Sequence, residues 1–167
     1  MANDKNKAMV DYLLQCAYIK NNPLFFNFGN AKDGTSQLIT SSNDVAQDNA
    51  FVDGSVLRRY TCNLLVYKSI SYNPIVTANV TTTVNPYPNE NIEELVDVQE
   101  ILDWVTAQNR AQQFPDFGVD CKVDSIEALT TNPTMSGVNS SITPALATYN
   151  ISIRVTYLDM TDTIWNK

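Results

Sequence analysis

The positions of apolar residues along the chain predict two helices. Between Asp4 and Tyr18 apolar residues recur every three to four positions, which is the spacing of one helix face. Asp4 is placed to cap the first turn, and Pro23 ends any continuation. This stripe consists of Met9, Val10, Leu13, Leu14 and Ala17. A second amphipathic helix is predicted over residues 91–113, with a stripe of Ile92, Leu95, Val98, Ile101, Leu102 and Val105.

Three segments alternate between apolar and polar residues and predict strands, at residues 55–71, 119–129 and 147–158. In the second of them Val119, Cys121 and Val123 share one face. Residues 24–28 predict a further short strand or extended segment. Clean alternation indicates an antiparallel sheet with one solvated face, and the two helices supply the other layer. The predicted fold class is therefore α+β, a single two-layer domain with an antiparallel sheet flanked by two amphipathic helices.

Three long polar segments, at about residues 30–53, 71–90 and 130–146, are predicted as loops. The first has room for one edge strand. Residues 76–84 have high β-propensity and no charge, so the second is predicted to project as a loop or hairpin that a partner subunit covers or that orders on assembly. Long loops of this kind are usually functional or disordered, which favours a module of an assembly.

Composition narrows the function classes. The 167 residues correspond to about one domain, and only 17% are charged, whereas 19 are Asn and 16 are Thr. Uncharged polar loops can be buried against neighbours at modest desolvation cost. The net charge of −7 argues against long-range attraction to nucleic acid or to an anionic membrane. The N-terminal region predicts neither a signal peptide nor a membrane span.

The residues that carry most enzyme chemistry are missing or scattered. Histidine is absent, which removes histidine triads, bases and metal ligands. Cys16, Cys62 and Cys121 are widely spaced and are expected to be buried free thiols in a reducing compartment. No nucleophile motif or glycine-rich phosphate loop occurs. We therefore predict no enzymatic activity, no cofactor and no metal.

Two charged groups remain as candidate sites. The carboxylates of the second helix best fit a solvated helix face, while the three that share one face, Glu93, Asp97 and Glu100, are the alternative ligands for a hard divalent cation. The candidate carboxylates are Glu93, Glu94, Asp97 and Glu100. The basic residues Arg58, Arg59 and Lys68 have Tyr60, Tyr67 and Tyr72 nearby. They fit salt bridges at an interface or rim or, less well given the negative net charge, a contact with DNA.

The order of several segments along nearly the whole chain resembles one protein family. These segments are residues 9–16 (MVDYLLQC), 22–29 (NPLFFNFG), 55–61 (SVLRRYT), 89–95 (NENIEEL) followed by 101–104 (ILDW), and 148–157 (TYNISIRVTY). Together they resemble the tail-terminator or minor capsid proteins of long-tailed bacteriophages and of phage-tail-like particles of Gram-positive hosts. This resemblance implies an α+β fold and a hexameric ring on the end of the tail tube. Such a ring stops tube polymerisation and provides the docking face for the head-side connector.

The resemblance implies that the partners are other copies of the chain, the tail tube protein and a head-side connector or stopper protein. The location would be the tail end or neck of the virion, reached from the host cytoplasm during assembly. It implies no catalytic residues, no membrane and no sequence-specific nucleic-acid binding. The alternatives are a head–tail connector or neck component of the same particle, or a small cytosolic protein-binding domain.

A ring needs two different faces of each subunit to meet, and an exposed sheet edge can supply one of them. The edges predicted for this purpose are the strand at 57–69 and a hairpin at 75–84. The candidate interface residues are Arg58, Arg59, Tyr60, Tyr67, Tyr72, Ile75, Val80 and Val84. The candidate acidic lumen or rim, which would let DNA pass without sticking, consists of Glu93, Glu94, Asp97 and Glu100.

Overall fold

The computed structural model describes residues 4–40, 49–70 and 90–163, with side chains in the last range described from residue 94 onward. In these ranges the chain is mixed α and β, with three helices and seven strands in one sheet. The helices are α1 (Lys5–Leu13), α2 (Ala17–Asn21) and α3 (Glu90–Arg110). The strands are β1 (Leu24–Phe26), β2 (Ser36–Thr40), β3 (Asn49–Ala50), β4 (Val56–Ile70), β5 (Cys121–Ala128), β6 (Met135–Asn139) and β7 (Ala145–Asp159).

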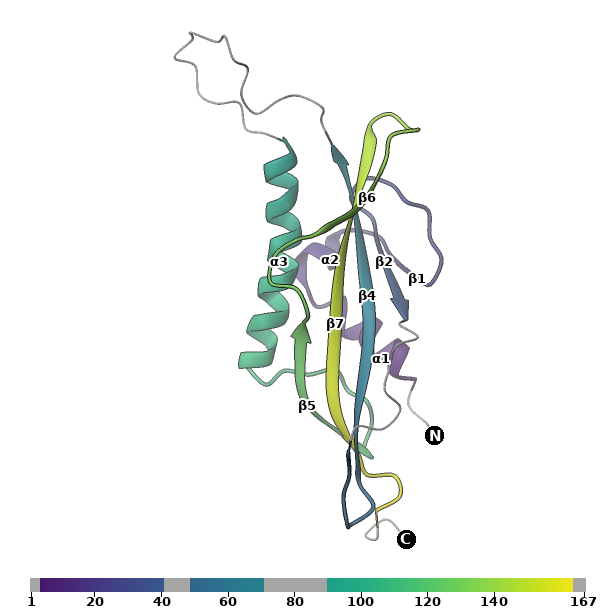
Figure 1. Ribbon diagram of the computed structural model, residues 1–167, viewed down its shortest axis with the longest axis vertical. Coiled ribbons are helices and arrows are strands. Elements are labelled where there is room, and N and C mark those ends of the chain that lie inside the picture. The colour runs from purple at the N-terminus through teal and green to yellow at the C-terminus, as the bar shows by residue number, and fades with distance from the viewer. Residues whose placement is uncertain (1–3, 41–48, 71–89, 164–167) are drawn as a thin grey trace.

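Two long antiparallel strands, β4 and β7, form the centre of the sheet (Figure 1). They pair without interruption from Val56 opposite Asp159 to Ile70 opposite Ala145. The strand order is β1-β2-β4-β7-β5, while β3 also pairs with β4 and β6 also pairs with β7. All pairings are antiparallel except that of β1 with β2, which is parallel. The sheet is therefore mixed, whereas the sequence predicted an antiparallel sheet.

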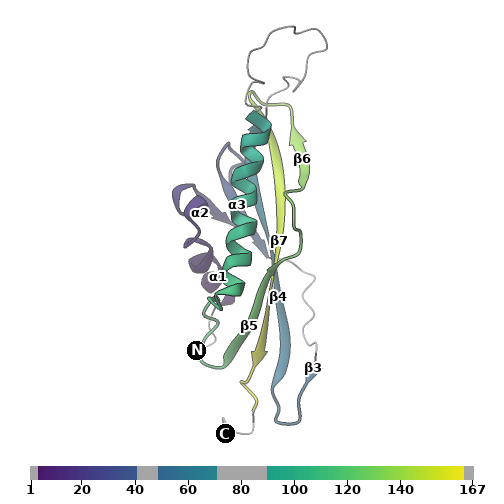
Figure 2. The same ribbon diagram turned by 90° about the vertical axis from the view of Figure 1, so that its left-hand side faces the viewer.

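All three helices lie on one side of the sheet (Figure 2). The core forms between them and the inward side chains of the long strands, because alternate residues of β4 and β7 point to the same face. Its fully buried large side chains are Met9, Leu13, Ile19, Leu38, Leu64, Val66, Val98, Ile101, Val105, Ile126, Ile151 and Ile153. The alternation of the predicted strand at 147–158 places Tyr149, Ile151, Ile153, Val155 and Tyr157 on its inward face, and all five are buried in β7.

The predicted first helix is divided into α1 and α2. Its cap is as predicted, since Asp4 Oδ1 accepts hydrogen bonds from the backbone N–H groups of Asn6 at 3.0 Å and Lys7 at 3.3 Å. The chain turns at residues 14–16 and a second short helix follows. Leu14 is consequently 41% exposed, although the pattern placed it in the stripe. The buried residues are Met9, Tyr12, Leu13, Cys16 and Ile19.

The second helix is confirmed as α3, and its residues Val98, Ile101, Leu102 and Val105 are buried as predicted.

The strand predicted at 119–129 is present as β5, but its predicted inward face is only partly right. The pairing of β5 with β7 shifts between Val123 and Ser125, so Ile126 points into the core after this bulge. Val119, predicted to face inward, lies before the strand and is 94% exposed.

Two of the predicted loops contain strands. The segment 30–53 contributes β2, which lies between β1 and β4 and is not an edge strand, and also β3. The segment 130–146 contributes β6. The third predicted loop lies outside the described residues apart from its last residue, Glu90, which begins α3.

The prediction that the strand at 57–69 forms a free edge of the sheet is wrong, because β4 is an interior strand. It pairs with β7 along one side and with β2 and β3 along parts of the other.

Cys16 and Cys62 are buried, Cys121 is partly buried, and all three are free thiols. Within the ranges given above, none of the helices is long and apolar enough to cross a membrane.

Candidate assembly surface

The side chains of β4 that were candidates for a subunit interface make contacts within the subunit. Tyr60 is 8% exposed and points to the helix-covered face, where its hydroxyl donates to Asn6 Oδ1 at 2.8 Å. Its ring meets Phe117 edge-on, with the ring centres 5.6 Å apart. Tyr60 is therefore a core residue, contrary to its assignment from sequence.

Arg58 and Tyr67 also make hydrogen bonds within the subunit. Arg58 Nε donates to Asp159 Oδ2 at 2.7 Å, which joins the two long strands near one end of the sheet. The hydroxyl of Tyr67 donates to Gln37 Oε1 at 2.9 Å and joins β4 to β2. Arg59 is partly exposed on the face opposite the helices. The remaining candidates, Tyr72, Ile75, Val80 and Val84, lie outside the described residues.

The candidate carboxylates of α3 do not act as one exposed group, because a buried lysine of β4 pairs with two of them. The side chain of Lys68 is only 7% exposed, and its Nζ lies 2.6 Å from Glu94 Oε2 and in direct contact with Asp97 Oδ2. The same Nζ lies 5.0 Å from the ring centre of Tyr18. These contacts fasten α3 to β4 and α2. Glu94 and Asp97 are thus anchoring residues of the fold, whereas Glu100 is exposed. The side chain of Glu93 lies outside the described part.

The charge state of this cluster follows from its contacts. Burial by itself lowers the pKa of Lys68, but the hydrogen bonds to Asp97 and Glu94 outweigh it, so the net pKa is raised above the ordinary value. Lys68 is therefore a permanent cation at neutral pH. A lysine held in this way is unsuited to act as a base or nucleophile, since either role requires a lowered pKa.

The face of the sheet opposite the helices carries few charges. The outward positions of β4 and β7 are occupied by Thr, Asn, Ser, Leu and Tyr, with Arg59 and Arg154 as the charged residues. Ser152 Oγ donates to Asn63 Oδ1 at 2.6 Å across the strand pair. The paired hydroxyl groups of Ser152 and Tyr67 lose little on being covered, because polar groups that already have a partner need no new one.

Exposed apolar side chains lie at β6, around β1, and at Phe51 and Val52 in the turn between β3 and β4. All five residues of β6 are exposed, and with the turn that follows it β6 presents Met135, Val138 and Ile142 to solvent. Around β1 the exposed side chains are Phe26 at 41% and Phe28 at 88%. Contiguous exposed apolar groups of this kind are typical of protein–protein contact sites.

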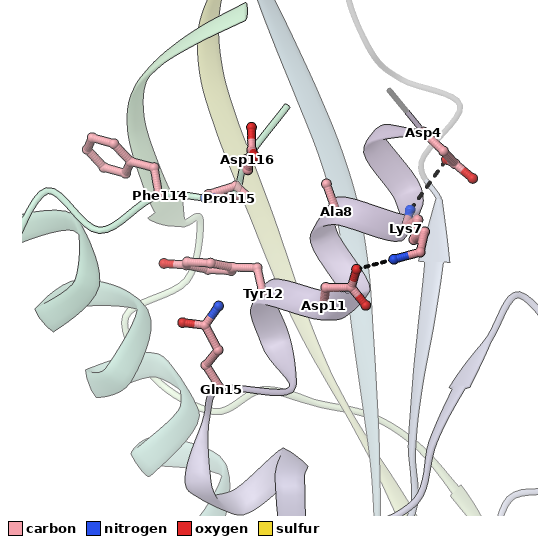
Figure 3. Close-up of a pocket in the computed structure, with 9 residues that line it drawn as sticks. All are labelled: Asp4, Lys7, Ala8, Asp11, Tyr12, Gln15, Phe114, Pro115 and Asp116. Carbon is pink, nitrogen blue, oxygen red and sulfur yellow. Dashed lines mark hydrogen bonds and ion pairs between the residues drawn. The ribbon is translucent and has the colours of Figure 1, made fainter. Parts of the chain in front are cut away.

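An open cavity of about 300 Å³ lies between α1 and the segment that follows α3 (Figure 3). Asp4, Lys7, Asp11 and Gln15 line one side and Phe114–Asp116 line the other, with the ring of Tyr12 between them. Lys7 is paired with Asp11 at 2.5 Å, and the Tyr12 hydroxyl donates to the Gln113 carbonyl at 2.9 Å. The cavity offers no nucleophile beside a base. No group of three or more His, Cys, Asp or Glu that could hold a metal occurs in the ranges described.

Sequence reasoning missed β6 and the role of Lys68. A signal for β6 was present, because no charged residue occurs between Glu127 and Arg154, a stretch of 26 residues. A lysine in a strongly alternating strand, at an inward position, was the corresponding signal for a buried ion pair.

Comparison with known proteins gives no match, either to a protein-family model or to a curated protein sequence.

Proposed function

We propose that this protein is a structural subunit of a bacteriophage tail or phage-tail-like particle. It forms a ring, by expectation a hexamer, on the end of the tail tube. There it stops tube polymerisation and offers a docking face to the head-side connector. The observation that carries this proposal is that the described helices cover one side of the sheet, which leaves for neighbours a long face with few charges along β4 and β7.

The chemistry of the described surface supports a role in assembly. Among the described residues no helix covers this face of the sheet, and exposed apolar side chains lie at β6 and around β1. Interfaces are depleted in charge at their centres, and the open sheet face has that composition. The resemblance of the chain to tail-terminator proteins supplies the particular assembly, namely a ring on the tail tube.

The proposal is tested by native mass spectrometry of the purified protein together with electron microscopy of tail tubes mixed with it. We expect hexamers in solution or rings on tube ends, and tubes that stop growing when the protein is added. A monomer in solution that assembles only on the tube is consistent with the proposal. A protein that stays monomeric and never caps tubes, at high concentration and with tubes present, overturns it.

The same experiment separates the two alternatives. A head–tail connector or neck component would bind the head-side partner and leave the growth of bare tubes unchanged. A small cytosolic protein-binding domain would neither oligomerise nor bind tubes.

A further inference from the structure

The cavity between α1 and the segment after α3 lies over the two central strands of the sheet. On the α1 side, Asn6 accepts a hydrogen bond from the hydroxyl of Tyr60 in β4. On the other side Phe117, the residue after the lining segment, packs edge-on against the rings of Tyr60 and of Tyr157 in β7. The cavity therefore lies above the rows of the sheet that contain these two tyrosines.

The lining of this cavity is acidic (Figure 3). Asp4, Asp11 and Asp116 line it, and all three residues are exposed. Lys7 is the one cation among the lining residues that the structure describes, and it is paired with Asp11. Apolar groups such as the ring of Phe114 lie beside the carboxylates. A cavity of this composition suits a side chain with an apolar stem and a cationic head, as in arginine.

Two arginines occupy the same level of the sheet on its open face. Tyr60 pairs with Val155, and both side chains are buried on the helix side. The residue before each of them, Arg59 and Arg154 respectively, therefore points to the open face. The arginines and the acidic cavity thus lie at one level along the strands, on opposite sides of the sheet.

The charged residues of β5 offset these arginines only in part. Glu127 Oε1 lies 3.6 Å from Arg154 Nη1, but the Glu127 side chain is 52% exposed and the pair is partly hydrated. Lys122 and Asp124 are both exposed and have opposite charges. Along β4, β7 and β5 the open face is therefore basic at this level, whereas the cavity behind it is acidic.

We infer that copies of the chain stack front to back, with the open sheet face of one copy against the helix side of the next. Arg59 and Arg154 of the one then enter the acidic cavity of the other, and the opposite charges fix the register of the contact. Because both surfaces lie at one level, a rotation about an axis parallel to the strands brings them together without a shift along that axis. The two surfaces differ, so the contact is heterologous and repeats from copy to copy, which closes a ring when the rotation permits.

This inference rests on the proposed ring and names the surface that would cover the open sheet face. It does not depend on what the ring binds. In such a ring the faces of each sheet are covered by neighbours, so that an edge of the sheet lines the lumen. The edge strand β5, which α3 contacts through Asn109, is one of the two edges available for this position.

Cysteine cross-linking tests the contact directly. In a Cys121→Ser background, which removes the partly buried native thiol, Arg59→Cys and Asp116→Cys are prepared separately, mixed and treated with a bis-maleimide. We expect a covalent dimer from the mixture and none from either variant alone. The reaction is run on the free protein and again with tail tubes present.

Charge reversal with rescue provides the second measurement. Arg59→Glu is expected to weaken self-association about tenfold or more, because it places a carboxylate against the acidic cavity of the next copy. Asp116→Lys should weaken it from the other side, by placing an ammonium group against the two arginines. Mixed in equal amounts, the two variants present opposite charges to each other at every contact and should associate again. Native mass spectrometry measures the association, on tubes if the free protein is monomeric.

Lys32→Glu is the matched control for Arg59→Glu. It makes the same change of charge at an exposed position before β2, away from both surfaces of the contact, and should leave self-association unchanged. Circular dichroism verifies that all three charge variants fold.

Dimers formed by Arg59→Cys alone would show two open sheet faces packed on each other and overturn the inference. Absence of the mixed dimer both in solution and on tubes would overturn it as well. So would a mixture of the two charge variants that does not associate, or an equal loss of association for Lys32→Glu. The proposed function fails separately, when electron microscopy shows bare tube ends although the mixed dimer forms.

Discussion

At the scale of single residues, a few charged side chains inside or beside the sheet hold elements of the fold together. Lys68 is the most deeply placed of them, and its two carboxylate partners are contributed by α3. Removing one partner of a buried ion pair usually costs more than the pair contributes, because the remaining charge is left without compensation. The anchoring of α3 therefore depends on residues that sequence alone assigned to a solvent-facing acidic rim.

Removing both carboxylates tests this anchoring. In the double variant Glu94→Gln and Asp97→Asn, Lys68 stays buried without a counter-charge. We expect the free energy of unfolding, measured with urea, to fall by about 3 kcal/mol, at the lower end of the range for buried pairs because the two carboxylates are partly hydrated. Glu100→Gln on the exposed side of α3 is the control and should change it by less than about 0.5 kcal/mol. Equal effects would contradict the anchoring role.

Asp159 predicts a dependence of stability on pH. Burial raises its pKa, but hydrogen bonds from the Thr161 hydroxyl and backbone and from Arg58 outweigh burial, so the net pKa lies below the ordinary value of 3.8. A lowered pKa in the folded state means that the contribution is fully present above pH 3.8 and is lost as the pH falls through the folded-state value.

Asp159→Asn should therefore destabilise the protein at pH 7, and the difference from the unmodified protein should shrink as the pH falls below about 4. Urea unfolding at a series of pH values measures this difference. Asp124→Asn, at an exposed position of β5, is the control, with an effect under about 0.5 kcal/mol at pH 7. A difference for Asp159→Asn that is constant with pH would contradict the assignment.

At the scale of elements, α3 does more than cover the core, because Asn109 near its end caps the edge of β5. Replacing Asn109 by Ala removes the acceptor for the Ile126 N–H and opens part of that edge. We expect a loss of about 1 kcal/mol in the free energy of unfolding and an increase in self-association at high concentration. Urea unfolding and size-exclusion chromatography measure the two effects. Thr106→Ala, on an exposed part of α3, should show no increase in self-association.

The long elements were predictable from sequence because their periodicity is strong. The alternation of β4 and β7, and the stripe residues Val98, Ile101, Leu102 and Val105 of α3, place the same residues inward as the structure does. The short elements were not, since β2 and β6 each have five residues and their pairing depends on distant strands. The bulge in β5 had a signal, because the apolar residues change phase between Val123 and Ile126.

The candidate site was less predictable than the fold. Alternation shows which residues of β4 share a face, but it does not show that β4 lies inside the sheet, which requires knowledge of β2 and β7. Tyr60 was accordingly assigned to a surface and lies in the core. Similarly, the spacing of Glu94 and Asp97 on a helix carries no information about Lys68, which approaches from another element.

At the scale of the whole molecule, polar character is unevenly distributed. The sheet face opposite the helices is nearly uncharged along β4 and β7, whereas α3 carries exposed carboxylates such as Glu100 on the other side. The hypothesis of an acidic lumen therefore requires α3 to face inward, and it now depends on Glu100 more than on Glu94 and Asp97.

Charge reversal at Glu100 tests whether α3 faces the lumen. If α3 lines the lumen, Glu100→Lys introduces one positive charge per subunit beside the passing DNA, and release of DNA from assembled particles should slow. The effect should be larger at low ionic strength, because exposed charges are screened beyond about 10 Å at 0.1 M salt. Asp124→Lys, which reverses an exposed charge on β5, is the matched control. Unchanged release and infectivity for Glu100→Lys would contradict the acidic lumen.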